Sequence, residues 1–300
     1  MKVRTPLLTV VMLGIVSVSL QAKTGILISK NNAMMMTPVR GIKSVIGGDV
    51  VALDMGGSAA TGKKHCVTFK QQKCQVVIAV GSAAARVAID ELGTIPVVFC
   101  MIMNPKESGI TGRTVTGVSL DIPVVKQFDA FKSVVPSLKK IGLVYSDEVG
   151  SSLVTEMKKA SAKAGFTLLE KKVASDKEVP NAIRSLKGNI DGLYLPPDRT
   201  VAKHDAFQFI ALFTFENNVP FMAPTSRFVK KGALVALMID YEEIGKQAAG
   251  IAKKILSGTA PGSIPVQPPN TTILVLNQKT AETIGINIPP GLTQSSKIIK

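Results

Sequence analysis

Short apolar runs alternate with amphipathic segments along most of the chain. The runs predict strands at 25–29, 50–55, 76–81, 97–101, 141–145, 167–173, 192–195, 220–223 and 234–239. Between them, apolar residues recur at helical spacing, and Val124, Phe128 and Phe131 share one face of such a segment. Strands and helices that alternate at this interval are typical of βαβ units. The pattern therefore predicts an α/β fold built on parallel sheets.

The length and the tail of the chain indicate two lobes. Three hundred residues with 46% hydrophobic content can bury more than one core. The last segment contains an extended stretch at 271–276 among prolines at positions 261, 265, 268, 269, 289 and 290. We interpret this proline-rich segment as a strap that crosses between the lobes.

The N-terminus has the pattern of a secretory signal. Lys2 and Arg4 precede an apolar run from Leu7 to about Leu20, and the small residue Ala22 follows. The run is shorter than the roughly 20 residues of a membrane-spanning helix. We therefore expect residues 1–22 to be a cleaved signal peptide and the protein to be exported, with an uncleaved anchor or a buried first strand as the alternatives. No cysteine follows the run, which argues against a lipid-anchored mature form.

The three cysteines are Cys66, Cys74 and Cys100. A helix at 58–73 would separate the first two by about 12 Å along its axis, whereas a disulfide needs Cα atoms within about 7 Å. We expect three unpaired, mostly buried thiols. Their spacing fits no zinc pattern, and His65 and His204 do not complete one, so we expect neither metal nor cofactor.

The formal charge of +15 raises the possibility of nucleic-acid binding. The lysines are scattered in pairs, however, and the chain has no Trp and no basic-aromatic interleaving of the kind that stacks bases. A solvated surface explains the charge better, and we expect no nucleic-acid partner. The excess could still steer an anionic ligand towards the protein.

Two enzymatic patterns are weak. The segment from Gly56 to His65 nearly spells a phosphate-binding loop, but Lys64 stands where a hydroxyl should bind magnesium. A hydrolytic triad has little support, because only His65 and His204 are present and no nucleophile elbow accompanies them. We expect a protein that is not an enzyme.

Polar side chains stand where predicted strands end, which is where open α/β sheets bind ligands. Ser82 and Ala83 open a helix after the strand at 76–81, and the unpaired N–H groups of such a helix end attract carboxylate or phosphate. Ser82 could equally cap its own helix. Three methionines at 34–36, after the first strand, could form a pliant apolar wall.

Two aspartates close later strands. Asp198 follows Pro196 and Pro197, and Asp240 stands directly before Tyr241. Each could hold a ligand ammonium group by charge-assisted hydrogen bonds, or cap the helix that follows it. Tyr145 and Asp147 end another strand and are weaker candidates on the same grounds.

Several segments resemble one known family. They are TGVS at 116–119 and the longer stretches at 139–152, 191–201, 228–258 and 276–292. Together they resemble the ABC-transporter substrate-binding proteins that include tryptophan- and tyrosine-binding members. The resemblance implies two Rossmann-like lobes of the type I periplasmic-binding-protein fold, joined by three crossings near Leu120, Asp240 and Val266. The lobes would be 23–120 plus 241–265, and 121–240 plus 266–300.

The resemblance also implies a pocket between the lobes. Position by position, it would comprise Ser29, Asn31, Ser82, Ala83, Tyr145, Asp147, Asp198, Ser226 and Asp240. The chain departs from the family at Arg199, where Asn is usual, at Arg227, where an acid is usual, and at Leu237–Met238, where the family has a more polar Tyr-Gly pair. The added positive charge puts an aromatic amino acid in doubt and leaves room for an acidic or larger ligand.

The function implied is a monomeric periplasmic binding protein. It would bind a small, amino-acid-like solute without a cofactor and deliver it to an ABC permease in the inner membrane. Two other hypotheses stay open: a sensor that presents its closed form to a membrane receptor or kinase, and an exported enzyme.

Overall fold

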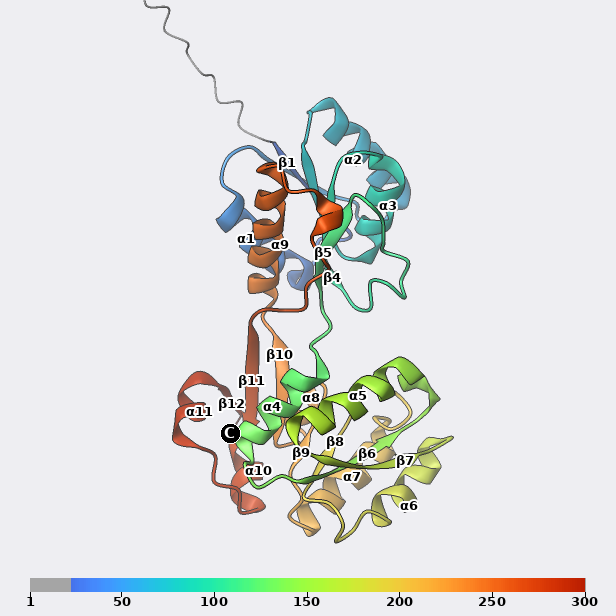
Figure 1. Cartoon of the computed structure of the whole chain (residues 1–300), viewed down its shortest axis with the longest axis vertical. Coiled ribbons are helices and arrows are strands. Elements are labelled where there is room, and N and C mark those ends of the chain that lie inside the picture. The colour runs from blue at the N-terminus through green and yellow to red at the C-terminus, as the bar shows by residue number, and fades with distance from the viewer. Residues whose placement is uncertain (1–22, 300) are drawn as a thin grey trace, which may run out of the picture.

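The computed structural model describes residues 23–299, and the predicted signal peptide at 1–22 lies outside this range. Figure 1 shows two lobes joined by a narrow waist. The upper lobe is built on a parallel sheet with the strand order β2-β1-β3-β4-β5. Its strands are β1 (Thr24–Ile28), β2 (Val50–Asp54), β3 (Val76–Val80), β4 (Val97–Ile102) and β5 (Val115–Ser119).

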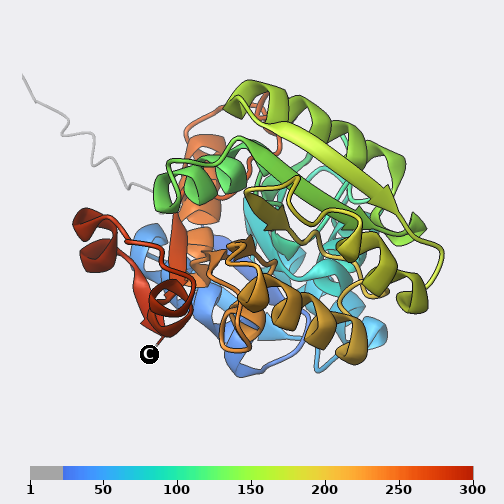
Figure 2. The same ribbon diagram turned by 90° about the horizontal axis from the view of Figure 1, so that it is seen from below.

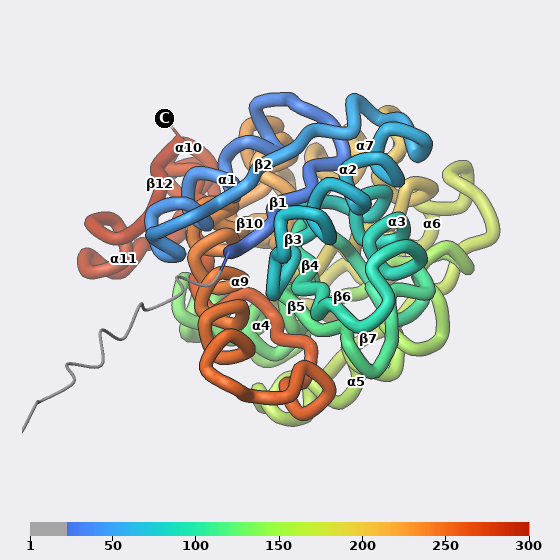
Figure 3. The backbone as a smooth tube through the Cα atoms, turned by 90° about the horizontal axis from the view of Figure 1, so that it is seen from above, coloured from blue at the N-terminus to red at the C-terminus, as the bar shows by residue number. Residues whose placement is uncertain are grey.

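Helices cover both faces of this sheet, so its inner strands are apolar on both sides. On one face lie α1 (Ala33–Ile46) and α9 (Tyr241–Leu256), and on the other α2 (Ala59–Gln71) and α3 (Ser82–Leu92) (Figures 1 and 3). Alternate residues of β3 enter the two cores, because Ile78 packs with the α1–α9 side and Val77 with the α2–α3 side.

The contact between α1 and α9 depends on two glycines. A Cβ atom at Gly41 would collide with the backbone carbonyl of Glu242, and one at Gly245 would collide with the carbonyl of Pro38. The two helix backbones therefore approach each other directly, and they seal one face of the upper lobe although they lie far apart in the sequence.

The lower lobe is built on a second sheet with the order β12-β11-β10-β9-β8-β6-β7, in which only the β10–β11 pair is antiparallel. Its strands are β6 (Lys140–Tyr145), β7 (Thr167–Lys172), β8 (Gly192–Tyr194), β9 (Phe221–Met222), β10 (Val235–Ile239), β11 (Thr272–Asn277) and β12 (Lys297–Ile299). Figure 2 looks at this lobe from below.

Helices again cover both faces of the sheet. One core includes side chains of α4 (Val124–Val134) and α5 (Ser151–Ala164), and the other includes those of α6 (Val179–Arg184) and α7 (His204–Glu216). Short helices complete the lobe: α8 (Ser226–Val229), α10 (Gln278–Thr283), α11 (Pro290–Ser295) and the 3-10 turns at Asp147–Val149 and Asp176–Glu178.

The chain passes between the lobes three times. The first crossing follows β5, the second lies at Asp240 between β10 and α9, and the third precedes β11. The third crossing is attached to both lobes. Gln267 exchanges backbone hydrogen bonds with the end of β5. Two residues later, the carbonyl of Pro269 accepts a hydrogen bond of 3.0 Å from the side-chain Nζ of Lys126 in α4. The proline-rich segment is therefore a strap between the lobes, as predicted.

The predicted α/β alternation is confirmed, and each predicted strand has an observed counterpart. Two strands were missed. β5 has the sequence VTGVS, in which Thr, Gly and Ser interrupt the apolar run, and Gly117 is needed because a Cβ there would collide with the backbone of Phe99. β12 is a three-residue edge strand. Within residues 23–299, no helix is long and apolar enough to cross a membrane.

Candidate functional site

A cavity of about 570 Å³ lies at the waist, where the carboxyl ends of several strands of both sheets meet the crossings. Residues of all three crossings line it: Leu120 to Pro123 of the first, Ile239 and Tyr241 around the second, and Val266 and Pro268 of the third. Further walls come from the segment after β4, from the ends of β8 and β9, and from α4 and α5. The hinge cavity, as we call it, therefore touches both lobes.

Most of the cavity wall is apolar. The apolar side chains include Met103, Leu120, Ile122, Leu153, Leu237, Met238 and Ile239. Among the described residues, Asp121 and Glu156 are the only charged groups in the lining. A concave, mainly apolar cavity with a few polar groups is the usual form of a small-molecule site.

A buried polar chain fixes one wall. The hydroxyl of Tyr194 donates a hydrogen bond of 2.9 Å to Oε1 of Gln127, and Nε2 of Gln127 donates one of 2.9 Å to the carbonyl of Ile122. The Tyr194 ring packs edge-on against Phe128 at 5.0 Å between centroids, and burial raises the pKa of its hydroxyl. The hydroxyl therefore stays neutral and ties β8 to α4 and the first crossing.

Asp121 lies on the first crossing, half-buried. Its two carboxylate oxygens accept hydrogen bonds of 3.1 and 3.0 Å from the backbone amide of Asn104. Burial raises the pKa of the carboxyl group above its usual range, although these hydrogen bonds oppose the shift, and the negative charges of Glu107 and Glu156 add to it. Oε1 of Glu156 accepts a hydrogen bond of 2.9 Å from Val124, the first residue of α4.

A smaller cavity of about 250 Å³ contains two of the predicted residues. It lies at the ends of β6 and β7 beside the start of α5, and Tyr145 and Asp147 line it. The Tyr145 hydroxyl donates to Glu170 at 3.3 Å, and Asp147 forms an exposed ion pair of 2.6 Å with Lys172. Both predicted groups therefore have partners within the lower lobe.

In the upper lobe, Ser29 and Ser82 have different roles at the start of α3. α3 begins at Ser82 without a side-chain cap of its own, so the alternative that Ser82 caps this helix is wrong. Instead, the hydroxyl of Ser29 accepts a hydrogen bond of 2.9 Å from the amide of Ala84. Ser82 and Ala83 are exposed, and no described residue accepts a hydrogen bond from their amides.

Asn31 is exposed in the loop after β1. Its neighbour Asn32 is the residue that caps α1, by accepting a hydrogen bond of 3.0 Å from Met35. The side chain of Asn31 is therefore not needed for the helix start.

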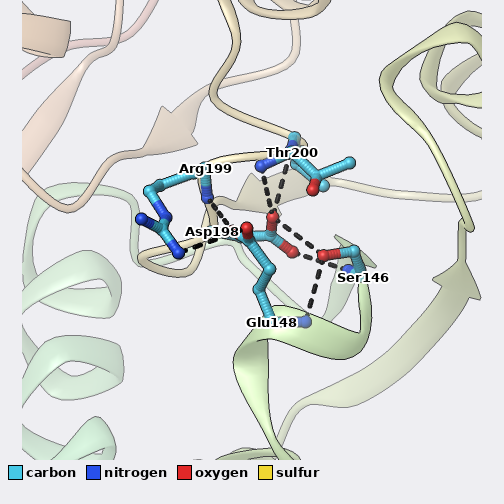
Figure 4. A network of polar contacts seen from close by, with 6 residues as sticks. Ser146, Glu148, Asp198, Arg199 and Thr200 are labelled. Carbon is cyan, nitrogen blue, oxygen red and sulfur yellow. Dashed lines mark hydrogen bonds and ion pairs between the residues drawn. The ribbon is translucent and has the colours of Figure 1, made fainter.

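Asp198 is the most enclosed of the predicted residues, with 3% of its surface exposed. Its carboxylate accepts hydrogen bonds from the amide and hydroxyl of Ser146, at 2.6 and 3.1 Å, and from the amides of Thr200 and Val201, at 2.9 and 3.1 Å (Figure 4). Oδ1 accepts three of these hydrogen bonds, and Oδ2 accepts the one from the amide of Ser146. This environment does not support the predicted ligand role. The Asp198 side chain instead connects the loop after β8 to the loop after β6 by hydrogen bonds.

The same loops are joined a second time. Oε2 of Glu148 accepts a hydrogen bond of 2.8 Å from the amide of Arg199, and its other oxygen lies 3.5 Å from the Arg199 guanidinium (Figure 4). The arginine side chain itself is exposed.

The two remaining predicted residues stand at helix starts. Asp240 caps α9 by accepting hydrogen bonds of 3.0 and 3.2 Å from the amides of Glu242 and Glu243, which realises the capping alternative. Ser226 begins α8 and is half-buried.

None of the nine predicted residues is among the described residues that line the hinge cavity, although Pro197, Thr225, Ile239 and Tyr241 are direct neighbours of three of them. Four polar residues of the cavity wall were not predicted from the sequence: Asp121, Gln127, Glu156 and Tyr194. Among them, Asp121 lies close to the TGVS segment and the predicted first crossing, which could have indicated it.

The alternative chemistries find no support. Lys63 of the phosphate-loop-like segment forms an ion pair of 2.9 Å with Glu91. His65 donates a hydrogen bond to the carbonyl of Asp54. All three thiols are free and buried, as predicted, and residues 23–299 contain no group of three or more His, Cys, Asp or Glu that could hold a metal ion.

Residues 54–299 match the sequence profile of the ABC transporter substrate binding protein family. The chain belongs to this family. Its members bind small molecules outside the cytoplasm, and the predicted family resemblance is confirmed.

Two curated proteins are similar in sequence to this chain. A tyrosine-binding protein of Clostridioides difficile (strain R20291) is 30% identical over 224 residues, which span 72% of this chain and 64% of the relative. The match therefore covers less than two thirds of that relative's own length. An uncharacterised protein of Rickettsia prowazekii is 25% identical over 214 residues, 71% of this chain and 67% of the relative.

Solved structures show the same fold. A ligand-free, open substrate-binding protein with adhesive properties from Clostridium difficile superposes with a TM-score of 0.75 at 24% identity, over 93% of this chain and 99% of the other. An ABC domain from Streptococcus pneumonia in complex with L-Trp gives a TM-score of 0.54 at 23% identity, over 93% of this chain and all of the other. The type I periplasmic-binding-protein fold is thereby confirmed.

Proposed function

We propose that this protein is the periplasmic solute-binding component of an ABC import system. It binds a small, amino-acid-like solute in the cleft between its lobes and hands it to a permease in the inner membrane. It acts as a monomer, without a cofactor, and releases the solute unchanged. The lobes comprise 23–120 plus 241–265, and 121–240 plus 266–300.

The observation that carries this proposal is the hinge cavity, whose walls come from both lobes and all three crossings. A ligand bound there touches both lobes, so it binds better to a closed arrangement than to an open one and shifts the population towards closure.

The strand ends supply further ligand contacts in the closed form. Asn31, Ser82 and Ala83 contribute from the upper lobe, where the free amides at the start of α3 suit a carboxylate. Tyr145, Asp147, Ser226 and Asp240 are the corresponding candidates below. Ser29 and Asp198 act indirectly, because their side chains are engaged by Ala84 and by the loops after β6 and β8.

The solute class rests on the relatives. One curated relative is named for tyrosine binding, and a protein of the same fold was solved with L-Trp. The apolar wall around Leu120, Leu237 and Met238 supports a solute with an apolar part.

The test uses the chain from residue 23 onward. Thermal shift and calorimetry with the twenty amino acids should find at least one that binds, and small-angle scattering with that amino acid should show a smaller radius of gyration. Mass spectrometry after prolonged incubation should recover the amino acid unchanged. Turnover of the compound would support the enzyme hypothesis instead, and absence of any binding would overturn the proposed ligand class.

Export can be tested separately. Mass spectrometry of the protein from the periplasmic fraction should find an N-terminus near Lys23. A retained Met1 would contradict the periplasmic assignment.

A further inference from the structure

The hinge cavity differs in charge from the chain as a whole. The sequence carries a formal charge of +15, yet the described residues that line the cavity include two carboxylates and no Lys, Arg or His. The cavity therefore has a negative lining inside a strongly basic protein, which favours a positively charged group within it.

The two carboxylates have no counter-ion among the described residues. Neither Asp121 nor Glu156 takes part in any of the ion pairs formed among residues 23–299. The negative charge of Glu156 contributes to the raised pKa of Asp121, although burial is the main cause. A ligand cation in the cavity would supply the positive charge that the protein does not place there.

The two carboxylates also hold backbone amides. Asp121 accepts from the amide of Asn104 with both oxygens, and Glu156 accepts from the amide of Val124 at the start of α4, where a negative charge is favourable. One oxygen of a side-chain amide can still accept a hydrogen bond from each of these amides, so Asn and Gln keep a backbone contact at both positions.

We propose that Asp121 and Glu156 recognise the cationic group of the ligand. Asp198 does not take this role, because its carboxylate already accepts four hydrogen bonds within the protein. This inference rests on the proposed function and names the ligand class more closely: a primary amine or an amino acid whose ammonium group lies between the two carboxylates and whose apolar part packs against Leu120, Leu237 and Met238. It argues against the acidic ligand considered from the sequence.

The two acids stand close to the first crossing. Asp121 lies on this crossing and accepts hydrogen bonds from Asn104 of the upper lobe, whereas Glu156 is exposed on α5 of the lower lobe. An ammonium group that donates hydrogen bonds to both carboxylates would therefore bind at the hinge between the lobes.

The test varies the ligand's charge and the protein's charge independently. The ligand panel contains each of the twenty amino acids, its decarboxylated amine and its deaminated acid, measured by calorimetry on the chain from residue 23 onward. The variants are Asp121→Asn and Glu156→Gln, which retain the hydrogen bonds from Asn104 and Val124. The matched control is Glu178→Gln, because Glu178 also accepts a backbone hydrogen bond, from Ala174 at 3.0 Å, but does not line the cavity.

We expect amine-bearing members of the panel to bind and their deaminated counterparts to bind at least tenfold more weakly. Each cavity variant should weaken the amine-bearing ligand about tenfold or more, and Glu178→Gln should not change its affinity. If a deaminated acid binds as tightly as its parent, or if both cavity variants retain full affinity, the charge assignment fails while the transport function stands. If no panel member binds, both proposals fail.

Discussion

The hydroxyl of Ser29, at the end of β1, accepts a hydrogen bond of 2.9 Å from the amide of Ala84 in the first turn of α3. A residue far away in the sequence thus caps the helix, and no described residue accepts a hydrogen bond from the amides of Ser82 and Ala83. Ser29→Ala should lower the free energy of unfolding by about 1 kcal/mol, as for other lost N-caps. Urea denaturation measures the loss. Ser82→Ala is the control and should change stability little, because its side chain makes no cap; equal losses in both variants would contradict the assignment.

Asp198 should be required for folding stability more than for direct ligand contact. Asp198→Ala leaves the buried amides of Ser146 and Val201 without an acceptor, and we expect it to cost about 3 kcal/mol or more of unfolding free energy. Chemical denaturation measures this loss. Asp147→Ala removes only an exposed ion pair and should cost less than about 1 kcal/mol. A fully stable Asp198→Ala protein with weakened ligand binding would restore the ligand role.

The raised pKa of Asp121 has a consequence for pH dependence. Because the folded state holds the proton more tightly than the unfolded state, this carboxyl group makes the protein lose stability as pH rises from its ordinary pKa of 3.8 through the raised value. Asp121→Asn lacks this loss, so its unfolding temperature should rise relative to the parent over that range. Thermal unfolding at a series of pH values measures the difference, and parallel curves for the two proteins would show that no such penalty exists.

The glycines of α9 should respond to substitution in opposite directions. Gly245→Ala forces a methyl group against the backbone of Pro38 and should destabilise the protein by about 1–3 kcal/mol. Gly250 lies in the same helix with open space around it, so Gly250→Ala should stabilise by about 0.5–1 kcal/mol through helix propensity. Thermal unfolding of both variants provides the comparison; a harmless Gly245→Ala would mean that α1 and α9 pack less closely.

The three thiols should be inert in the folded protein. Burial raises the pKa of Cys66 to about 11 and that of Cys100 to about 12, and it raises the pKa of Cys74 as well. At pH 8 the reactive thiolate is scarce and enclosed. A thiol reagent should therefore label the protein only after denaturation in guanidinium, and then at all three cysteines. Rapid labelling of the native protein, or fewer than three thiols after denaturation, would contradict this expectation.

The sequence was sufficient for local structure and insufficient for long-range side-chain contacts. Apolar runs located the strands from β1 to β4 and from β6 to β10, and most of these strands are buried. β11 corresponds to the stretch at 271–276, which was predicted only to be extended. The short polar strand β5 lacks such a run. The cap formed by Asp240 also followed from sequence, since donor and acceptor are two and three residues apart.

The candidate site shows where such reasoning ends. Ser29 meets Ala84, and Asp198 meets Ser146, across more than fifty residues of sequence, so these contacts could not be foreseen from neighbouring residues. Asp121 and Glu156 lie on a crossing and on a helix surface, and only the folded chain places them in one cavity. Neither residue follows a strand that the apolar runs predicted, so the pattern of strand ends did not indicate them.

The packing of α9 against α1 has a consequence for how the protein is made. The core beneath α1 contains Ile244, Ala248 and Ile251, which the ribosome adds only after most of the second sheet. A nascent chain that has just completed β5 therefore exposes the apolar underside of its first sheet and cannot yet close it. Translation must continue through Leu256 before the first lobe can mature, so prematurely terminated chains should be degraded by cellular proteases rather than accumulate as a stable fragment.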